Sequence, residues 1–202
     1  MLKNVKRSLD KIAKSLEASH QAREYLIKNT RDIVILCSQS IIAVHKGDLK
    51  LARKNVLMAK KLLAKYKKSA NGDLVRYLVT PEQEIVEAAS LISIVEGKPI
   101  PSVESIGVSD ESYILGLLDC IGELKRLIYD KIRIGKTSES VRFFEIMENL
   151  YLILYPFATY DKIVKETRKK LDVNRILVEE TRSALTEEIR RAKLIDAINK
   201  IK

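Results

Sequence analysis

The sequence predicts an all-α protein, and three observations support this class. Only seven Gly and four Pro interrupt the 202 residues, so long stretches contain no residue that ends a helix. Leu, Ile, Lys, Glu and Arg are abundant, whereas aromatic residues make up 5% of the chain. Apolar residues recur three or four positions apart, and no segment alternates as a strand would. We expect a single domain, residues 1–202, that forms a bundle of seven helices.

The first predicted helix is long, because neither Pro nor Gly occurs between Leu2 and His45. Its first apolar stripe consists of Leu2, Val5, Leu9, Ile12 and Leu16. A helix of this length measures about 60 Å, which exceeds a small domain, so we expect its ends to pack on other subunits. Gly47 and Asp48 should end this helix and cap the next one.

The second predicted helix, from Asp48 to about Ser69, is strongly basic. It contains eight Lys and Arg residues after Asp48 and no further acid. From Ala70 to Leu124 the balance reverses, and ten acids accompany two basic residues. In a chain of net charge +10, a basic helix beside an acidic segment can bind a polyanion and a cation together. The alternative for the basic run is an ordinary solvated surface helix.

The third predicted helix starts after a turn at 71–73, with Asp73 as a candidate N-cap, and is interrupted at Thr80 and Pro81. Thr at the N-cap, Pro at the first helical position and acids in the first turn are typical of a helix start, so we expect a break or kink there. The segment then continues to Glu96 with apolar residues on all sides. Glu84 and Glu87 therefore lie on a mostly buried helix, where carboxylates must be paired or bound to a metal.

Four further helices complete the prediction after a loop from Gly97 to Val103. They cover residues 109 or 110 to about 133, 138–155, 159–171, and a last segment from after 172 to beyond 191. The fourth helix should be capped by Ser109 or Asp110. Gly116 and Gly122 weaken this fourth helix, so we expect another helix or a substrate to approach it closely there.

Two pairs of carboxylates stand out in these apolar helices. Glu84 and Glu87 are three residues apart, and Asp119 and Glu123 are four apart. Both spacings place the two side chains on one helix face, where like charges repel. Two such pairs suggest a shared counter-charge, most simply a divalent cation. The alternative is that each pair lies on a solvated stripe and has no function.

The Cys and His residues indicate no site of their own. Cys37 and Cys120 lie in apolar helical patterns, which are typical of small buried side chains rather than of a disulfide or a zinc site. We interpret His20 and His45 as surface or helix-end residues. No apolar run reaches about 18 residues and the N-terminal segment does not resemble a signal peptide, so we expect a soluble, cytoplasmic protein without a membrane span.

Several segments, in their order and spacing, resemble the translin superfamily over nearly the whole chain. They are Arg23-Glu24, Thr30–Ile33, Arg76, Gln83–Ser90, Tyr113–Arg126, Asp172-Val173 and Val178–Glu180. The two carboxylate pairs resemble the branch of translin-associated factor X (Trax), whereas translin itself lacks the pattern of the first pair. Pro81 departs from the family, in which an uninterrupted helix is expected, and this affects the orientation expected for Glu84.

The resemblance to Trax implies a metal-dependent endoribonuclease that acts on single-stranded RNA. Its catalytic and metal-binding set would be Glu84, Glu87, Asp119 and Glu123. An oxygen-only set favours Mg²⁺ or Mn²⁺ over zinc. We assign metal ligation to Asp119, Glu123 and Glu87, and either ligation or water positioning to Glu84. The resemblance also implies a closed, barrel-like homo-oligomer, commonly an octamer, whose active sites face an internal cavity.

Basic residues are the candidates for contact with the RNA backbone. They are Arg53, Lys54, Lys60, Lys61, Arg76, Lys125 and Arg126. Because aromatic side chains are scarce, base stacking should be sparse and sequence preference weak. Two other functions stay open: a translin-like protein that binds single-stranded DNA or RNA without cleaving it, and a helical scaffold that binds partners through its long first helix.

Overall fold

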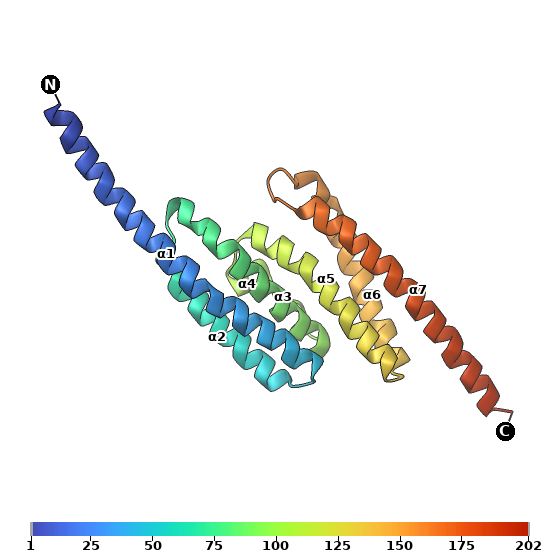
Figure 1. Cartoon of the computed structure of the whole chain (residues 1–202). Coiled ribbons are helices and arrows are strands. Elements are labelled where there is room, and N and C mark those ends of the chain that lie inside the picture. The colour runs from blue at the N-terminus through green and yellow to red at the C-terminus, as the bar shows by residue number, and fades with distance from the viewer. Residues whose placement is uncertain (1, 202) are drawn as a thin grey trace.

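The computed structural model describes residues 2–201, which are almost entirely helical (Figure 1). Within these residues there are seven α-helices and two 3-10 helices. The α-helices are α1 (Lys3–His45), α2 (Leu49–Lys67), α3 (Val79–Glu96), α4 (Val103–Ile106), α5 (Asp110–Arg133), α6 (Thr137–Leu154) and α7 (Thr167–Asn199). The 3-10 helices are η1 (Gly72–Leu78) and η2 (Tyr155–Tyr160). The predicted all-α class and the long first helix are confirmed.

Helix α5 lies in the middle of the bundle. On one side it packs on α3, which in turn packs on α1 and α2, and on the other side it packs on α6 and α7. The helices α1 and α7 extend beyond the bundle in opposite directions, so the two ends of the chain lie far apart (Figure 1). None of the helices within residues 2–201 combines the length and the apolar character needed to cross a membrane. Residues of α3 and of α7 thus reach the two flanks of α5.

Helix α3 is buried on nearly all sides, as its apolar sequence predicted. Its fully covered residues include Ile85, Val86, Ala88 and Leu91. Helix α5 approaches it closely because Gly116 has no side chain: an added Cβ would lie 2.5 Å from the carbonyl oxygen of Gln83 and 2.7 Å from Cβ of Val86. The close approach predicted at Gly116 is therefore confirmed, whereas a Cβ at Gly122 would meet nothing within 4 Å.

The two ends of α1 differ in their surroundings. Residues 3–20 are all exposed, and the side chains of Leu9 and Leu16 are 57% and 64% accessible. Packing of this part on other subunits stays a prediction. At the opposite end, Gly47 has a φ of 81° and the carboxylate of Asp48 accepts a hydrogen bond from the backbone N–H of Leu51 at 2.9 Å. The predicted turn and cap between α1 and α2 are confirmed.

The helix start predicted at Thr80 and Pro81 lies two residues earlier, where η1 ends and α3 begins. Helix α3 begins at Val79 with Leu78 in the N-cap position, and η1 leads directly into it. Pro81 is the third residue of α3, where it is tolerated because the first four N–H groups of a helix have no acceptor within the helix. Glu84 and Glu87 therefore project from one unbroken helix.

The predicted sixth helix, 159–171, and the break at Asp172 are wrong. The chain forms η2 and then turns until Glu166, whose φ is 72°, and α7 begins at Thr167. Helix α7 runs through Asp172 because its buried stripe is continuous on both sides of that residue. The stripe consists of Thr167, Leu171, Asn174, Val178, Thr181 and Leu185. The seven observed α-helices thus include the short α4, which the sequence did not predict.

Candidate active site

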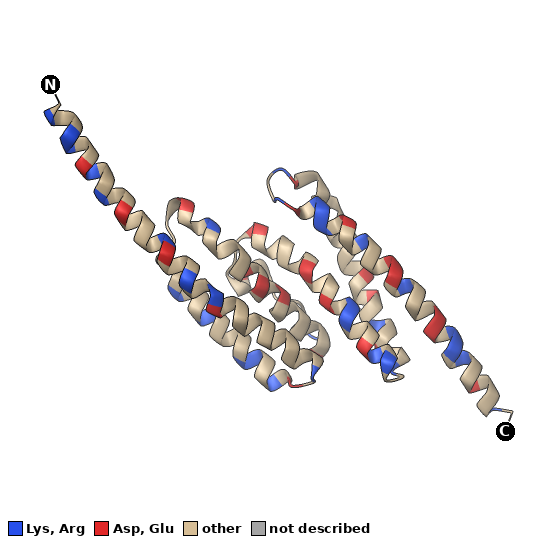
Figure 2. Ribbon diagram, in the orientation of Figure 1, with Lys and Arg blue, Asp and Glu red and all other residues tan. Residues whose placement is uncertain are grey.

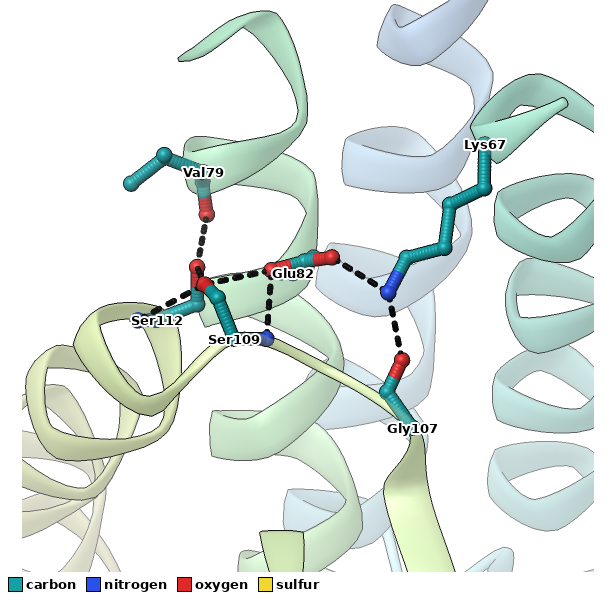
Figure 3. Close-up of polar contacts among 6 residues, drawn as sticks. All are labelled: Lys67, Val79, Glu82, Gly107, Ser109 and Ser112. Atoms are coloured by element: carbon teal, nitrogen blue, oxygen red, sulfur yellow. Dashed lines mark hydrogen bonds and ion pairs between the residues drawn. The ribbon is translucent and has the colours of Figure 1, made fainter. Parts of the chain in front are cut away.

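A buried polar cluster fixes the start of α3 against the start of α5 (Figure 3). Glu82, which is 3% exposed, accepts hydrogen bonds from the backbone N–H and the hydroxyl of Ser109, at 2.9 and 2.8 Å. Its other oxygen pairs with Nζ of Lys67 at 2.7 Å, and this ammonium also donates to the carbonyl of Gly107. Burial acts to raise the pKa of Glu82, but Lys67 and Ser109 together bring it below its usual value. The cluster holds α3 and α5 at a fixed offset directly before Glu84.

The four predicted site carboxylates lie on the packed helices α3 and α5, near enough for their charges to affect one another. Glu84 and Glu87 lie one turn apart on α3, and Asp119 and Glu123 lie one turn apart on α5. Burial raises the pKa of Glu84, and the charge of Asp119 raises it further. Lys170 of α7 acts in the opposite direction. Two helices thus assemble the acidic set that the sequence suggested.

Glu87 is the carboxylate most affected by this crowding. Burial raises its pKa, and the charges of Asp119, Glu84 and Glu123 raise it further, to about 8. The ammonium of Lys170 lowers the pKa but does not offset these effects. A carboxylate cluster that is short of positive charge and partly shielded from water is typical of a site that binds a cation.

Helix α7 contributes two residues that the sequence did not indicate. Nζ of Lys170 forms an ion pair and hydrogen bond with the carboxylate of Asp119. The side-chain amide of Asn174 donates a hydrogen bond of 2.9 Å to the carbonyl of Leu118 and so holds α7 against α5. The predicted break at Asp172 concealed both residues. The buried stripe of α7, which passes through Leu171 and Asn174, was the signal that could have revealed them.

His45 is a third residue that the structure adds to the site. It is the last residue of α1, as a helix-end residue would be, but its side chain is only 5% exposed. Nε2 lies 2.6 Å from a carboxylate oxygen of Glu123. Nδ1 lies 3.4 Å from a carboxylate oxygen of Asp130, but without hydrogen-bond geometry. The imidazole therefore sets the orientation of Glu123, whereas His20 is exposed on the outer part of α1.

Two cysteines lie beneath the carboxylates. Cys37 and Cys120 are both free and fully buried. Burial, with the charges of Glu84 and Glu87, raises the pKa of Cys37 far above its usual value, and burial with the charge of Glu87 does the same for Cys120. Both side chains are therefore thiols at neutral pH and pack as small apolar groups, as predicted.

The donor set fits a hard divalent cation such as Mg²⁺ or Mn²⁺, because all four predicted ligands offer carboxylate oxygens. As the side chains stand, no three His, Cys, Asp or Glu residues within 2–201 are close enough together to hold a metal ion. Lys170 and His45 instead engage Asp119 and Glu123. A cavity of about 310 Å³ between α5 and α7 is bordered by Asp119, Gly122 and Lys170. Metal binding therefore requires these carboxylates to turn away from Lys170 and His45.

Two of the predicted RNA-contacting residues lie beside the carboxylates. Lys125 and Arg126 lie two and three residues after Glu123 on α5, and Figure 2 shows only acidic positions on the first part of this helix and both acidic and basic positions toward its end. Lys125 forms an ion pair with Glu180 of α7. A guanidinium nitrogen of Arg126 lies 3.7 Å from Glu123, and this side chain is 55% exposed. Both residues can therefore meet a polyanion that enters the acidic site.

The basic residues of α2 lie on another side of α3. Arg53 pairs with Glu96 of α3, and Arg53, Lys60 and Glu96 border a groove between the two helices. At about 100° per residue, Glu96 points roughly 120° away from Glu84 and 180° away from Glu87 around α3. Arg53 and Lys60 therefore lie away from the carboxylates of their own chain, and Lys54 and Lys61 follow them directly on the same helix. Their contact with RNA stays a prediction.

Arg76 occupies a third location, on η1. The guanidinium groups of Arg76 and Arg23 lie 5.1 and 5.6 Å from the centroid of the Tyr77 ring, and both donate hydrogen bonds to its hydroxyl. These hydrogen bonds lower the pKa of Tyr77. A cavity of about 700 Å³ between α1 and η1 adjoins this cluster. Arg76 is thus open to an anion but is separate from the carboxylates.

Comparison with known proteins places this architecture in a family. A family model described as the Translin family matches residues 72–181, which is more than half of the chain. The chain belongs to the translin family. An uncharacterized protein of Methanocaldococcus jannaschii is 34% identical to it over 182 residues, which span 89% of this chain and 82% of that protein.

Solved structures share the fold of this translin-family chain. The crystal structure of AfC3PO is 31% identical with a TM-score of 0.84, and the comparison covers 93% of this chain and 99% of that one. The protein in the structure of an AfC3PO–duplex RNA complex is 30% identical with the same TM-score, and the comparison covers 93% of this chain and 98% of that one. Apo-NeC3PO, at 20% identity and a TM-score of 0.76 over 93% and 98% of the two chains, shares the fold.

The region matched by the translin-family model contains some of the candidate residues and not others. It contains the four carboxylates and both residues of α7, namely Glu84, Glu87, Asp119, Glu123, Lys170 and Asn174. The basic residues of α2 and His45 precede residue 72. The acidic cluster is thus part of the region that defines the family match.

Proposed function

We propose that this translin-family protein is an endoribonuclease of the Trax type that depends on Mg²⁺ or Mn²⁺ and cleaves single-stranded RNA. The observation that carries the proposal is the convergence of four carboxylates on two packed helices, with the pKa of Glu87 raised to about 8. Carboxylates whose charges raise one another's pKa favour a cation bound near them. The resemblance of these four residues to those of Trax supports a catalytic role.

The carboxylates divide the work between metal binding and proton transfer. Asp119 and Glu123 would bind the ion together with Glu87 from the facing helix, and Glu84 would either join them or hold the attacking water. The bound ion supplies an activated water and offsets the charge that builds on the phosphate. Because burial and Asp119 raise the pKa of Glu84, its carboxylate can accept a proton from that water more readily than an exposed Glu.

Cations around the cluster would position the RNA backbone. Lys170 borders the cavity of about 310 Å³ beside Asp119, where its ammonium can bind a phosphate oxygen next to the scissile bond. Lys125 and Arg126 extend the positive charge along α5. Contacts of this kind hold the backbone but read no bases, which agrees with the weak sequence preference expected from the composition.

A relative supports RNA as the polyanion. AfC3PO, 30% identical to this chain, has been solved in a complex with duplex RNA. The preference for single strands rests on the resemblance to Trax. A test must therefore offer both forms of RNA and compare their rates of cleavage.

We further propose that the protein forms a closed homo-oligomer, an octamer as in Trax-like proteins, and that it acts in the cytoplasm. The outer part of α1 supports assembly, because an exposed row of apolar side chains on a helix is typically covered by a partner. This row consists of Leu2, Val5, Leu9, Ile12 and Leu16. Native mass spectrometry of the full chain gives the number of subunits, and a monomer at micromolar concentration would contradict this part.

The decisive experiment is a cleavage assay with end-labelled single-stranded and duplex RNA, in Mg²⁺, in Mn²⁺ and in EDTA. Wild-type protein is compared with Glu123→Gln and with the control Glu145→Gln, which changes an exposed carboxylate of α6. We expect metal-dependent cleavage that falls at least roughly 100-fold in Glu123→Gln, because a ligand is lost, and persists in the control. Cleavage that survives in Glu123→Gln would exclude the four-carboxylate site as its source.

One observation favours a second candidate, a protein of the translin type that binds single-stranded DNA or RNA without cleaving it. Lys170 and His45 already engage two of the carboxylates, so the acids have partners without a metal. In that case the affinity for RNA depends strongly on salt concentration and does not change when EDTA is added. Retention of intact RNA in every metal tested would establish this alternative.

A further inference from the structure

A cleft at the start of α7 combines aromatic and charged side chains. It has a volume of about 400 Å³ and lies between the end of α6, η2 and the first turns of α7. Its polar and aromatic lining consists of Tyr151, Tyr155, Thr159, Arg168, Asp172 and Arg175. Small-ligand sites in proteins have volumes of roughly 300–1,000 Å³, so the cleft can hold a small molecule or one unit of a polymer.

The cleft is separate from the acidic cluster. At about 100° per residue, Arg168, Asp172 and Arg175 lie within roughly 60° of one another around α7. Lys170 and Asn174, which reach α5, point roughly 100–160° away from this group. A ligand in the cleft would thus occupy the side of α7 that faces α6 and η2.

The charged groups of the cleft have no partners among residues 2–201. The ion pairs of α7 use Lys170, Glu179, Glu180, Arg182, Glu187 and Arg190. Asp172 is four residues from Arg168 and three from Arg175, yet it pairs with neither. Asp161 accepts a hydrogen bond from the backbone N–H of Arg168 at 2.9 Å and not from its guanidinium. Two guanidinium groups that are paired with no carboxylate outnumber the one acid of the cleft, Asp172, and so favour an anion that can accept paired hydrogen bonds, such as a phosphate.

The aromatic groups lie next to these charges. The rings of Tyr151 and Tyr155 have centroids 6.0 Å apart and planes inclined by 55°. Tyr155 is 58% exposed and Tyr151 is half-buried, and burial followed by the neighbouring Tyr155 raises the pKa of Tyr151. Two of the eight tyrosines in a chain without Trp thus meet at this cleft. Exposed tyrosine rings are platforms on which nucleic-acid bases stack.

We propose that the cleft binds a ribonucleotide unit. Arg168 and Arg175 hold its phosphate, and the exposed ring of Tyr155, which packs against Tyr151, stacks on its base. Asp172 accepts a hydrogen bond from a ribose hydroxyl, because an ionised carboxylate can only accept. A 2′-hydroxyl is absent from DNA, so this contact favours RNA. The unit is either a free mononucleotide or part of an RNA strand, and neither case depends on the carboxylate site.

The test measures binding to the full-length wild-type chain in EDTA, so that its outcome is independent of the nuclease proposal. The probes are AMP, 2′-deoxy-AMP and inorganic phosphate by calorimetry, and a fluorescent eight-nucleotide single strand of RNA or DNA by anisotropy. Variants are Arg168→Gln, Arg175→Gln, Tyr155→Ala and Asp172→Asn. The matched control is Arg191→Gln, an exposed position of α7 beyond the cleft. Circular dichroism checks that each variant is folded.

We expect each Arg→Gln variant to weaken binding about tenfold or more, through loss of a charged hydrogen bond. Tyr155→Ala should weaken it roughly fivefold or more, through loss of stacking. Asp172→Asn should bring the affinities for AMP and 2′-deoxy-AMP closer together, and Arg191→Gln should change nothing. If AMP binds and the variants weaken its binding in this way, the ligand is a free nucleotide. If the variants weaken only the binding of the oligonucleotide, the ligand is an RNA strand. Inorganic phosphate that competes as well as AMP, or variants that bind like wild type, would overturn the proposal.

Discussion

His45 and Glu123 join the end of α1 to the middle of α5 through a contact of 2.6 Å between Nε2 and a carboxylate oxygen. These residues are 78 positions apart in the sequence. The imidazole is buried and Glu123 is 23% exposed. The buried imidazole therefore holds one carboxylate oxygen of Glu123 in place. His45 therefore positions a proposed metal ligand without belonging to the oxygen donor set itself.

The first prediction concerns this contact. His45→Ala should raise the Mn²⁺ concentration needed for half-maximal RNA cleavage, roughly 10–100-fold, because groups that orient metal ligands affect metal affinity to this extent. The KM for RNA should stay unchanged. His45→Gln, whose amide can still donate to Glu123, should recover most of the loss. The control is His20→Gln on the exposed part of α1. A loss of activity in His45→Ala at unchanged metal dependence would contradict the positioning role.

The second prediction concerns the stability of the metal-free protein as the pH rises. The pKa of Glu87 is about 8 in the folded chain and near its usual 4.5 in the unfolded chain. A raised acid pKa favours folding most below pH 4.5, and this contribution is lost as the pH rises through 8. Glu87→Gln stays neutral, so it should raise the Tm at pH 9 by several degrees, on the order of 5 °C, and have little effect at pH 4.

Thermal unfolding in EDTA between pH 4 and pH 9 measures this effect. Glu145→Gln on α6 is the control and should follow the wild type at every pH. Mn²⁺ should stabilise the wild type more at high pH, where the carboxylates are ionised, and it should stabilise Glu87→Gln less. If the difference in Tm between Glu87→Gln and the wild type were the same at pH 4 and pH 9, the pKa of Glu87 would not be raised by its neighbours as described here.

The third prediction has the opposite sign and concerns Glu82. The bonds from Lys67 and Ser109 keep the pKa of Glu82 below its usual value, although burial opposes them. A lowered acid pKa stabilises the fold above pH 4.5, and this stability is lost as the pH falls through the folded-state value. Glu82→Gln should therefore cost about 1–3 kcal/mol at pH 7, where Lys67 loses its counter-charge, and less as the pH falls toward 3. Urea unfolding at both pH values measures the difference, and a constant difference would contradict this account.

Much of the fold could be predicted because its signals are local. The turn at Gly47 and Asp48 and the cap at Ser109 are determined by residues that lie within a few positions of each helix end. The carboxylate pairs could be predicted for the same reason, since helical spacing alone places Glu84 with Glu87. Local signals also caused the errors. We predicted that Pro81 would be the first residue of its helix, whereas it is the third residue of α3, within the first turn.

The rest of the site depends on contacts between distant segments. Lys170 and His45 reach the carboxylates from 51 and 78 residues away, and neither lies in a motif that marks it. Asp172 illustrates the difficulty: we expected one helix to end before it and the next to begin after it, but buried residues on both sides of it keep α7 continuous. Which helix faces which is decided by packing, and packing also places Arg53 of α2 beside Glu96 and away from the four site carboxylates.

The fourth prediction tests whether the closeness of α3 and α5 creates the site. Gly116→Ala would place a Cβ 2.5 Å from the carbonyl oxygen of Gln83, a backbone atom that can move only with α3. We expect a loss of stability of about 1–3 kcal/mol and a marked loss of metal-dependent cleavage as the carboxylate pairs separate. Gly122→Ala lies on the same helix with nothing within 4 Å, so it should gain about 0.5–1 kcal/mol from helix propensity.

The two variants are measured by urea unfolding and by cleavage of single-stranded RNA. If close packing sets the geometry of the acids, Gly116→Ala loses activity even under conditions where the variant is fully folded. Restored cleavage at high Mn²⁺ would indicate that the separated ligands can still be drawn together by the ion. Full activity of folded Gly116→Ala at ordinary Mn²⁺ would show that the carboxylates act without the close contact between α3 and α5.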